Sequence, residues 1–172
     1  PVPPASPMPI DPARPFKPVR IAILTISDSR STDDDTSGDK LVELLTGAGH
    51  ELAARAIIRD ETDLIVSRLH NWIDDPAVDV VITTGGTGLT GRDVTPEALH
   101  RLDGKAIPGF GELFRWISFQ KIGTSTIQSR ACAVVARGTY IFALPGSTGA
   151  VTDAWEGILE SQLDSRHRPC NF

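Results

Sequence analysis

The chain has 172 residues, of which 40% are hydrophobic and 23% charged, and its formal net charge is −5. This length fits one domain whose folding buries about 70% of the unfolded surface. The acidic balance argues against nucleic-acid and membrane-surface binding, and we see no transmembrane run or secretory signal, so we expect a cytoplasmic protein.

The first 18 residues hold eight of the thirteen prolines. Because proline fixes φ and lacks an N–H group, this stretch cannot continue a helix or pair as a central strand. We predict a proline-rich flexible arm over residues 1–18 and a single domain over residues 19–172.

Strand and helix patterns alternate from residue 19 onward. In chain order we predict a buried strand at 19–26, a helix ending near 47–49, a strand at 52–58, a helix at 62–74, a buried strand at 78–84, a helix after 95, a helical stretch after 111, a hairpin from 131–136 and 140–144, and a last helix at 151–163. This alternation predicts a three-layer αβα fold with a mostly parallel, mixed central sheet.

Several side chains are assigned from pattern alone. Trp116 and Trp155 are interpreted as core anchors, and Leu64 is expected on the buried side of its helix. The four histidines are expected at the surface: His50, His70, His100 and His167. Cys132 and Cys170 lack ligand spacing and are interpreted as free thiols in a reducing compartment.

The most informative segment is the strand at 78–84 that runs into Gly85-Gly86-Thr87-Gly88. A glycine loop between a strand and a helix brings backbone N–H groups close to phosphate. Thr95 is predicted as the N-cap of the following helix. The segment lacks the lysine of a P-loop and the spacing of the dinucleotide fingerprint, so a purely structural tight turn stays an equal alternative.

Four predicted strand ends carry small, polar or acidic residues: residues 27–28, 60–61, 85–88 and 145–147. Ligands of open parallel sheets bind outside the carboxyl ends of the strands, which favours a ligand site here. Asp60 and Asp93 are the acids that we expect at a Mg²⁺ ion shared with substrate phosphates. Asp60 as a helix N-cap is an equally good interpretation.

Local positive charge for an anionic ligand is sought in five side chains: Arg92, Lys105, Arg115, Lys121 and Arg130. Residues 118–130 are rich in Ser and Thr, which suits a phosphate or a polar heterocycle, and the alternative is a loop that caps its own backbone. The run of three acids at 33–35 is interpreted as a solvated loop with one working member, since three adjacent acids cannot all face one ion.

These motifs resemble the molybdenum-cofactor MogA/MoaB family. The resemblance rests on residues 84–98 (TGGTGLTGRDVTPEA), 35–38 (DTSG), 108–112 (PGFGE), 125–130 and 144–146 (LPG), and it covers essentially residues 19–172. Residues 122–130 and the ending 168–172 are similar to the MoaB branch in particular.

The resemblance implies an adenylyltransferase that uses ATP and Mg²⁺ to convert molybdopterin to its adenylylated form with release of pyrophosphate. It implies that Asp60 and Asp93 serve metal and catalysis. Nucleotide binding is implied for Gly85, Gly86, Thr87, Gly88, Pro145 and Gly146. Molybdopterin binding is implied for Ser125, Ser129, Arg130 and Ser147. The family also implies a homotrimer or a hexamer.

One departure is the absence of a second proline after Pro145-Gly146, which adenylyltransferase members often carry. Some MoaB-branch proteins look catalytically silent and lack the acid matching Asp60, which this chain retains. A non-catalytic molybdopterin-binding or scaffold protein, and a regulatory module that binds ATP alone, are the alternatives.

Overall fold

The structure is a computed structural model that describes residues 10–172. Its six strands form one sheet in the order β2-β1-β3-β6-β5-β4. Their bounds are β1 Arg20–Ile26, β2 Glu51–Ile58, β3 Val80–Thr84, β4 Lys105–Ala106, β5 Cys132–Ala136 and β6 Thr139–Leu144. Strands β2, β1, β3 and β6 are parallel, whereas β5 runs antiparallel to both β6 and β4. The predicted mostly parallel, mixed sheet is therefore confirmed.

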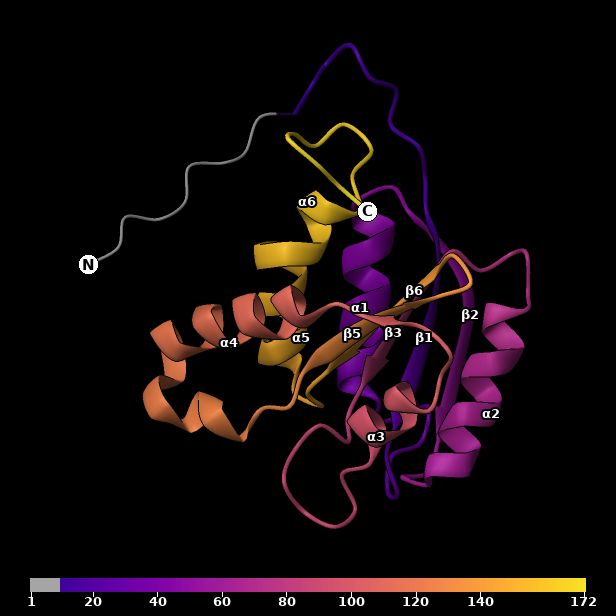
Figure 1. Ribbon diagram of the computed structural model, residues 1–172, viewed down its shortest axis with the longest axis vertical. Helices are drawn as coiled ribbons and strands as arrows, with labels where there is room; N and C mark the ends of the chain where they lie inside the picture. Colours follow the sequence, from indigo (N-terminus) through magenta and orange to yellow (C-terminus); the bar gives the residue numbers. More distant parts are fainter. Residues whose placement is uncertain (1–9) are drawn as a thin grey trace.

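Helices cover both faces of this sheet (Figure 1). Their bounds are α1 Thr36–Gly47, α2 Thr62–Ile73, α3 Thr95–His100, α4 Pro108–Ile122, the 3₁₀ helix η1 Gly123–Gln128, α5 Thr148–Ala154, the π-helical turn η2 Trp155–Leu159 and α6 Glu160–Gln162. The last predicted helix thus contains a π-helical turn in its middle.

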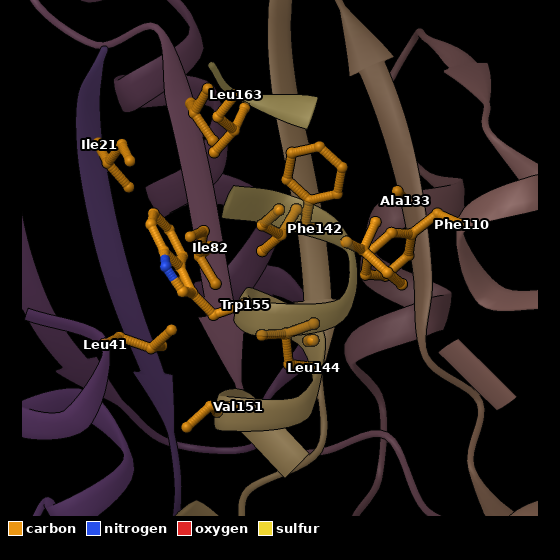
Figure 2. Packing of buried hydrophobic residues seen from close by; sticks show 14 of the residues in the cluster. Ile21, Leu41, Ile82, Phe110, Ala133, Phe142, Leu144, Val151, Trp155 and Leu163 are labelled. Atoms are coloured by element: carbon orange, nitrogen blue, oxygen red, sulfur yellow. The ribbon is translucent and has the colours of Figure 1, made fainter. Parts of the chain in front are cut away.

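Each face of the sheet has its own apolar core. Trp155, which is 2% exposed, lies within the first core, where α1, α4, α5 and η2 pack on the sheet (Figure 2). The second core joins the opposite face to α2 and α3 through residues such as Leu69 and Leu99. Helix, sheet and helix form three layers, as the alternation of elements predicts.

The hairpin of β5 and β6 turns at Arg137 and Gly138, whose φ angles are 48° and 84°. Two consecutive residues with positive φ are typical of the type I′ turn, whose twist matches that of the flanking strands. The predicted hairpin is confirmed.

Four burial predictions are wrong. Leu64 is 41% exposed and Trp116 is 45% exposed, because the buried rows of α2 and α4 run along Ile65-Leu69 and Phe110-Phe114 instead. His50 and His167 are each only 5% exposed. His50 Nδ1 accepts a hydrogen bond from the Val19 N–H at 3.0 Å, and His167 forms a β-bridge with Ile10.

Residues 10–18 of the predicted arm lie along the C-terminal segment. Lys17 N–H donates to Ser165 Oγ at 2.9 Å, and the Ser165 hydroxyl donates to Pro15 O at 2.9 Å. The Phe16 ring packs against His50 with 5.2 Å between ring centroids. These contacts differ from the expectation of a free extension for this part of the arm; its first nine residues lie outside the described residues.

Across residues 10–172, none of the helices has the length and apolar character needed to cross a membrane. The cytoplasmic location stays a prediction.

Candidate functional site

A cavity of about 440 Å³ opens at the carboxyl ends of β3 and β6. It lies beside the topological switch point of the sheet, where the chain has placed β2 on one side of β1 and places β3 on the other side. This is where ligands bind in open parallel sheets. The cavity is lined by Gly85, Gly86, Thr87, Gly88, Asp93, Phe114, Ser118, Ile122, Gln128, Ser129, Pro145, Gly146, Ser147 and Ala150. All six residues predicted for the nucleotide therefore lie on one cavity.

The glycine loop adopts a backbone that side chains would obstruct. Gly85 and Gly86 have φ angles of 107° and 70°. A Cβ on Gly85 would lie 2.2 Å from Ile26 O, and one on Gly86 would lie 2.3 Å from Thr95 Oγ1. Both positions require glycine for its φ and for the close approach of neighbouring groups.

The sequence predicts Thr95 as the N-cap of α3, and this prediction is wrong. The N-cap is Val94, and the Thr95 hydroxyl instead donates to Gly85 O at 2.9 Å while the Thr95 N–H donates to Gly86 O at 3.0 Å. The first residue of α3 therefore holds the glycine loop in place.

Asp60 lies at the edge of the cavity without lining it. A Cβ on Gly86 would lie only 3.1 Å from Asp60 Oδ1, so the carboxylate faces the glycine loop. Burial raises the pKa of Asp60, and the negative charges of Asp28 and Asp93 raise it further. The N-cap of α2 is Glu61, which rules out the N-cap interpretation of Asp60.

Asp93 lines the cavity and is held by its own loop. Its Oδ2 accepts hydrogen bonds from Thr90 N–H at 2.9 Å and from the Thr90 hydroxyl at 2.7 Å. Burial opposes ionisation, but these bonds outweigh it and lower the pKa of Asp93. Asp93 is therefore ionised at neutral pH.

The positive side chains in this region are engaged in contacts within the protein. Arg130 Nε donates to Gly88 O at 2.7 Å, its Nη2 donates to Asp93 O at 2.7 Å, and it pairs with Glu97. Arg130 therefore braces the outside of the glycine loop. Arg92 pairs with Asp28, Lys121 pairs with Asp153, and Arg115 donates to Ala131 O at 3.0 Å. Lys105 lies on the edge strand β4.

Two residues predicted for molybdopterin, Ser129 and Ser147, line the cavity, whereas Ser125 and Arg130 do not. Three further lining residues, Ser118, Ile122 and Gln128, belong to the stretch 118–130 that the sequence predicts to face a ligand, whereas Phe114 and Ala150 lie outside every predicted site segment. Phe114, Ser118 and Ile122 follow one another at intervals of four, so one face of α4 forms a wall. That spacing was the available signal.

Among the described residues, no group of three or more His, Cys, Asp or Glu side chains is arranged to hold a metal ion. Mg²⁺ usually takes one or two carboxylates and completes its shell with water and substrate phosphates. The mutual repulsion of Asp60 and Asp93 fits such a partial site, because a cation between them would relieve it.

The fold and the cavity define a class: a three-layer α/β protein with a glycine loop that lines a cavity at the carboxyl edge of its sheet. Residues 22–165 match the family described as a probable molybdopterin binding domain. The chain is 52% identical to molybdenum cofactor biosynthesis protein B of Escherichia coli K12 over 157 residues, which cover 91% of this chain and 92% of that protein. It is 41% identical to the protein of the same name from Bacillus subtilis, covering 84% and 86%.

Solved structures agree. The tungsten cofactor synthesizing protein MoaB from Pyrococcus furiosus superposes with a TM-score of 0.75 at 34% identity, covering 84% of this chain and 92% of that one. A structure of MogA superposes with a TM-score of 0.72 at 30% identity, covering 84% and 97%. The chain belongs to the molybdenum cofactor biosynthesis protein B family of molybdopterin-binding domains.

Proposed function

We propose that this protein adenylylates molybdopterin with Mg-ATP and releases pyrophosphate. The observation that carries the proposal is the position of Asp60 beside Gly86, at the edge of a cavity formed by the glycine loop and Pro145-Gly146. A carboxylate repelled by two neighbouring acids next to an anion-binding loop suits a metal-bound triphosphate.

In the proposed reaction, a terminal phosphate oxygen of molybdopterin attacks the α-phosphorus of ATP. A new P–O bond forms, the bond between the α-phosphorus and its bridging oxygen to the β-phosphorus breaks, and the electron pair leaves with pyrophosphate. The attacking oxygen is already anionic, so no protein base is needed. The contribution of the protein is positioning and charge stabilisation.

Each part of the site has a proposed task. Backbone N–H groups of the glycine loop bind phosphate, and Ser129 and Ser147 offer hydroxyl groups to the pterin. Asp60 and Asp93 would hold Mg²⁺, which neutralises the triphosphate when bound. Phe114 and Ile122 form an apolar wall that excludes water from one side of the cavity.

We also propose that the chain forms a homotrimer or a hexamer. Five apolar side chains of α4 and η1 are exposed in the single chain: Leu113, Trp116, Phe119, Ile122 and Ile127. Such a set is larger than scattered surface residues explain and is typical of a subunit interface. Sedimentation equilibrium tests this, and a monomer at micromolar concentration would contradict it.

The function is tested by incubating the purified protein with molybdopterin and ATP, with and without Mg²⁺, and measuring adenylylated molybdopterin and pyrophosphate in equal amounts. The same assay is applied to Asp60→Asn. Asp63→Asn is its matched control, since Asp63 is an exposed acid on α2 that pairs with Arg101. Replacing ATP with GTP or CTP measures the nucleotide preference. If no product forms although molybdopterin binds, the result favours a binding or scaffold protein. If ATP binds and molybdopterin does not, the result favours a regulatory module.

A further inference from the structure

A buried polar network lies behind the cavity and centres on Asp35, the N-cap of α1, which is 0% exposed. Its carboxylate accepts hydrogen bonds from the Thr25 hydroxyl at 2.7 Å, from Gly38 N–H at 3.1 Å and from Arg55 Nη2 at 2.8 Å. Within the acidic run at 33–35, Asp35 therefore serves the fold, and Asp34 accepts a hydrogen bond from the Ser31 hydroxyl at 3.2 Å.

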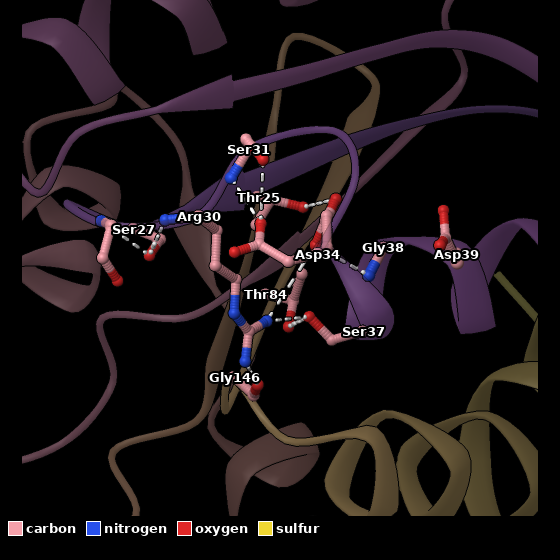
Figure 3. Close-up of polar contacts among 12 residues, drawn as sticks. Thr25, Ser27, Arg30, Ser31, Asp34, Ser37, Gly38, Asp39, Thr84 and Gly146 are labelled. Carbon is pink, nitrogen blue, oxygen red and sulfur yellow. Dashed lines mark hydrogen bonds and ion pairs between the residues drawn. The ribbon is translucent and has the colours of Figure 1, made fainter.

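Arg30 connects this network to the wall of the cavity. Its guanidinium lies 3.9 Å from Asp35 Oδ1, donates to Ser37 Oγ at 2.7 Å and donates to Gly146 O at 2.9 Å. Figure 3 shows Arg30 lying between Ser37 and Gly146. One planar side chain therefore joins the loop after β1, the first turn of α1 and the loop after β6.

A second contact supports the same wall. The Thr84 hydroxyl lies 3.1 Å from Ser37 Oγ and 3.1 Å from Pro145 O. The wall is also close to the glycine loop, because a Cβ on Gly146 would lie 3.3 Å from Gly85 Cα. A small shift of the Gly146 backbone would therefore change the space available to a ligand.

We propose that Arg30 is a positioning residue that holds the Pro145-Gly146 wall against the glycine loop, with Asp35 and Ser37 holding Arg30. Its guanidinium donates to the Gly146 carbonyl, so Arg30 fixes the position of the wall without itself lining the cavity. The ligand-binding consequence of this inference rests on the proposed function, whereas the positioning itself does not.

Arg55 provides a matched control. It also pairs with Asp35, at 2.8 Å, but it extends from β2 and its other ion pair is with Asp39. Arg30→Ala and Arg55→Ala each remove one arginine from the same buried carboxylate, and only the first removes a contact with the cavity wall.

The test measures amide hydrogen exchange in the ligand-free variants by NMR, together with the affinity for Mg-ATP. The reporters are the amides of Gly85, which donates to Leu144 O at 2.9 Å, and of Ala150, which donates to Ser147 Oγ at 3.1 Å. We expect Arg30→Ala to speed exchange at both amides relative to Arg55→Ala and to weaken Mg-ATP binding about tenfold. Added guanidinium at low millimolar concentration should partly restore binding to Arg30→Ala alone.

Equal exchange at the two reporter amides in both variants would overturn the positioning role, whatever the affinity shows. Faster exchange only in Arg30→Ala would support it, even if the wild-type protein bound no Mg-ATP. A wild-type protein that binds no Mg-ATP would contradict the proposed function, but it would not contradict the positioning role of Arg30. The two proposals can therefore fail separately.

Discussion

Asp35 and Asp60 both follow parallel strands at the same edge of the sheet, but their surroundings differ. Asp35 is fully buried; burial alone would raise its pKa, yet donors from Arg55, Thr25 and Gly38 hold the pKa below the usual value. Asp60 is half-buried, and burial together with the charges of Asp28 and Asp93 raises its pKa.

This contrast distinguishes Asp35, which stabilises the fold, from Asp60, which destabilises it at neutral pH. A carboxylate with a lowered folded-state pKa adds stability at neutral pH, whereas one with a raised pKa reduces it. Acids whose pKa the fold raises and that lie at the edge of a cavity are candidates for function.

If the protein adenylylates molybdopterin as proposed, Asp60→Asn is expected to reduce this transfer by about 100-fold or more, because it removes charge that would face a metal-bound triphosphate. The raised pKa means that stability from Asp60 is present below the unfolded-state pKa and is lost as the pH rises through the folded-state pKa. At pH 7 the substitution should therefore leave the melting temperature unchanged or raise it. Initial rates and thermal unfolding of the same sample measure both effects, and a large loss of stability would contradict the assignment.

Asp35→Ala is expected to lower the free energy of unfolding by roughly 3 kcal/mol, the lower end of the cost of breaking a buried ion pair. The lower end applies because Arg30 and Arg55 keep some contact with solvent. Urea unfolding measures the change, with Asp39→Ala as a control, since Asp39 is an exposed partner of the same Arg55. Equal effects of the two substitutions would show that the buried network adds nothing.

Acidification is expected to act on the two acids in opposite directions. The lowered pKa of Asp35 means that its stability is present above the unfolded-state pKa and is lost as the pH falls through the folded-state pKa. The decrease in unfolding free energy caused by Asp35→Asn should therefore become smaller toward low pH. The increase caused by Asp60→Asn should disappear there. Urea unfolding of both variants at pH 7 and near pH 3 measures this. Parallel pH profiles would remove the basis of the comparison.

Ser147→Ala is expected to lower the free energy of unfolding by about 1 kcal/mol, because Ser147 Oγ caps α5 by accepting from Ala150 N–H. If the hydroxyl also serves the pterin, the KM for molybdopterin should rise more than kcat falls. Ser147→Thr keeps a capping oxygen and should recover most of the stability. A stability loss with an unchanged KM would restrict Ser147 to capping.

The main features of the fold were predictable because strands and turns carry local signals. Continuous apolar runs identified β1 and β3, and the Arg137-Gly138 pair identified the hairpin. The rule that ligands bind at the carboxyl ends of parallel strands also brought the glycine loop and Pro145-Gly146 together.

The errors have a common physical origin in contacts between distant segments. His50 packs against Phe16 and Trp155, and His167 forms its β-bridge with Ile10, so no local pattern contains the partners of either histidine. The hydrophobicity of Trp116 predicts that it is buried, whereas Phe110 and Phe114 determine which face of α4 packs on the core. Arg30 lies 116 positions before Gly146, so its role depends on a fold that sequence spacing does not describe.

Titrating the aspartate carboxyl groups of the ligand-free protein with ¹³C NMR would measure the difference between the two acids, with Asp60→Asn and Asp35→Asn to assign the two signals. We expect Asp60 to titrate above the usual aspartate range and Asp35 below it. An Asp60 pKa at or below that of Asp35 would contradict the distinction between an acid at the edge of the cavity that neighbouring acids repel and a buried acid that stabilises the fold.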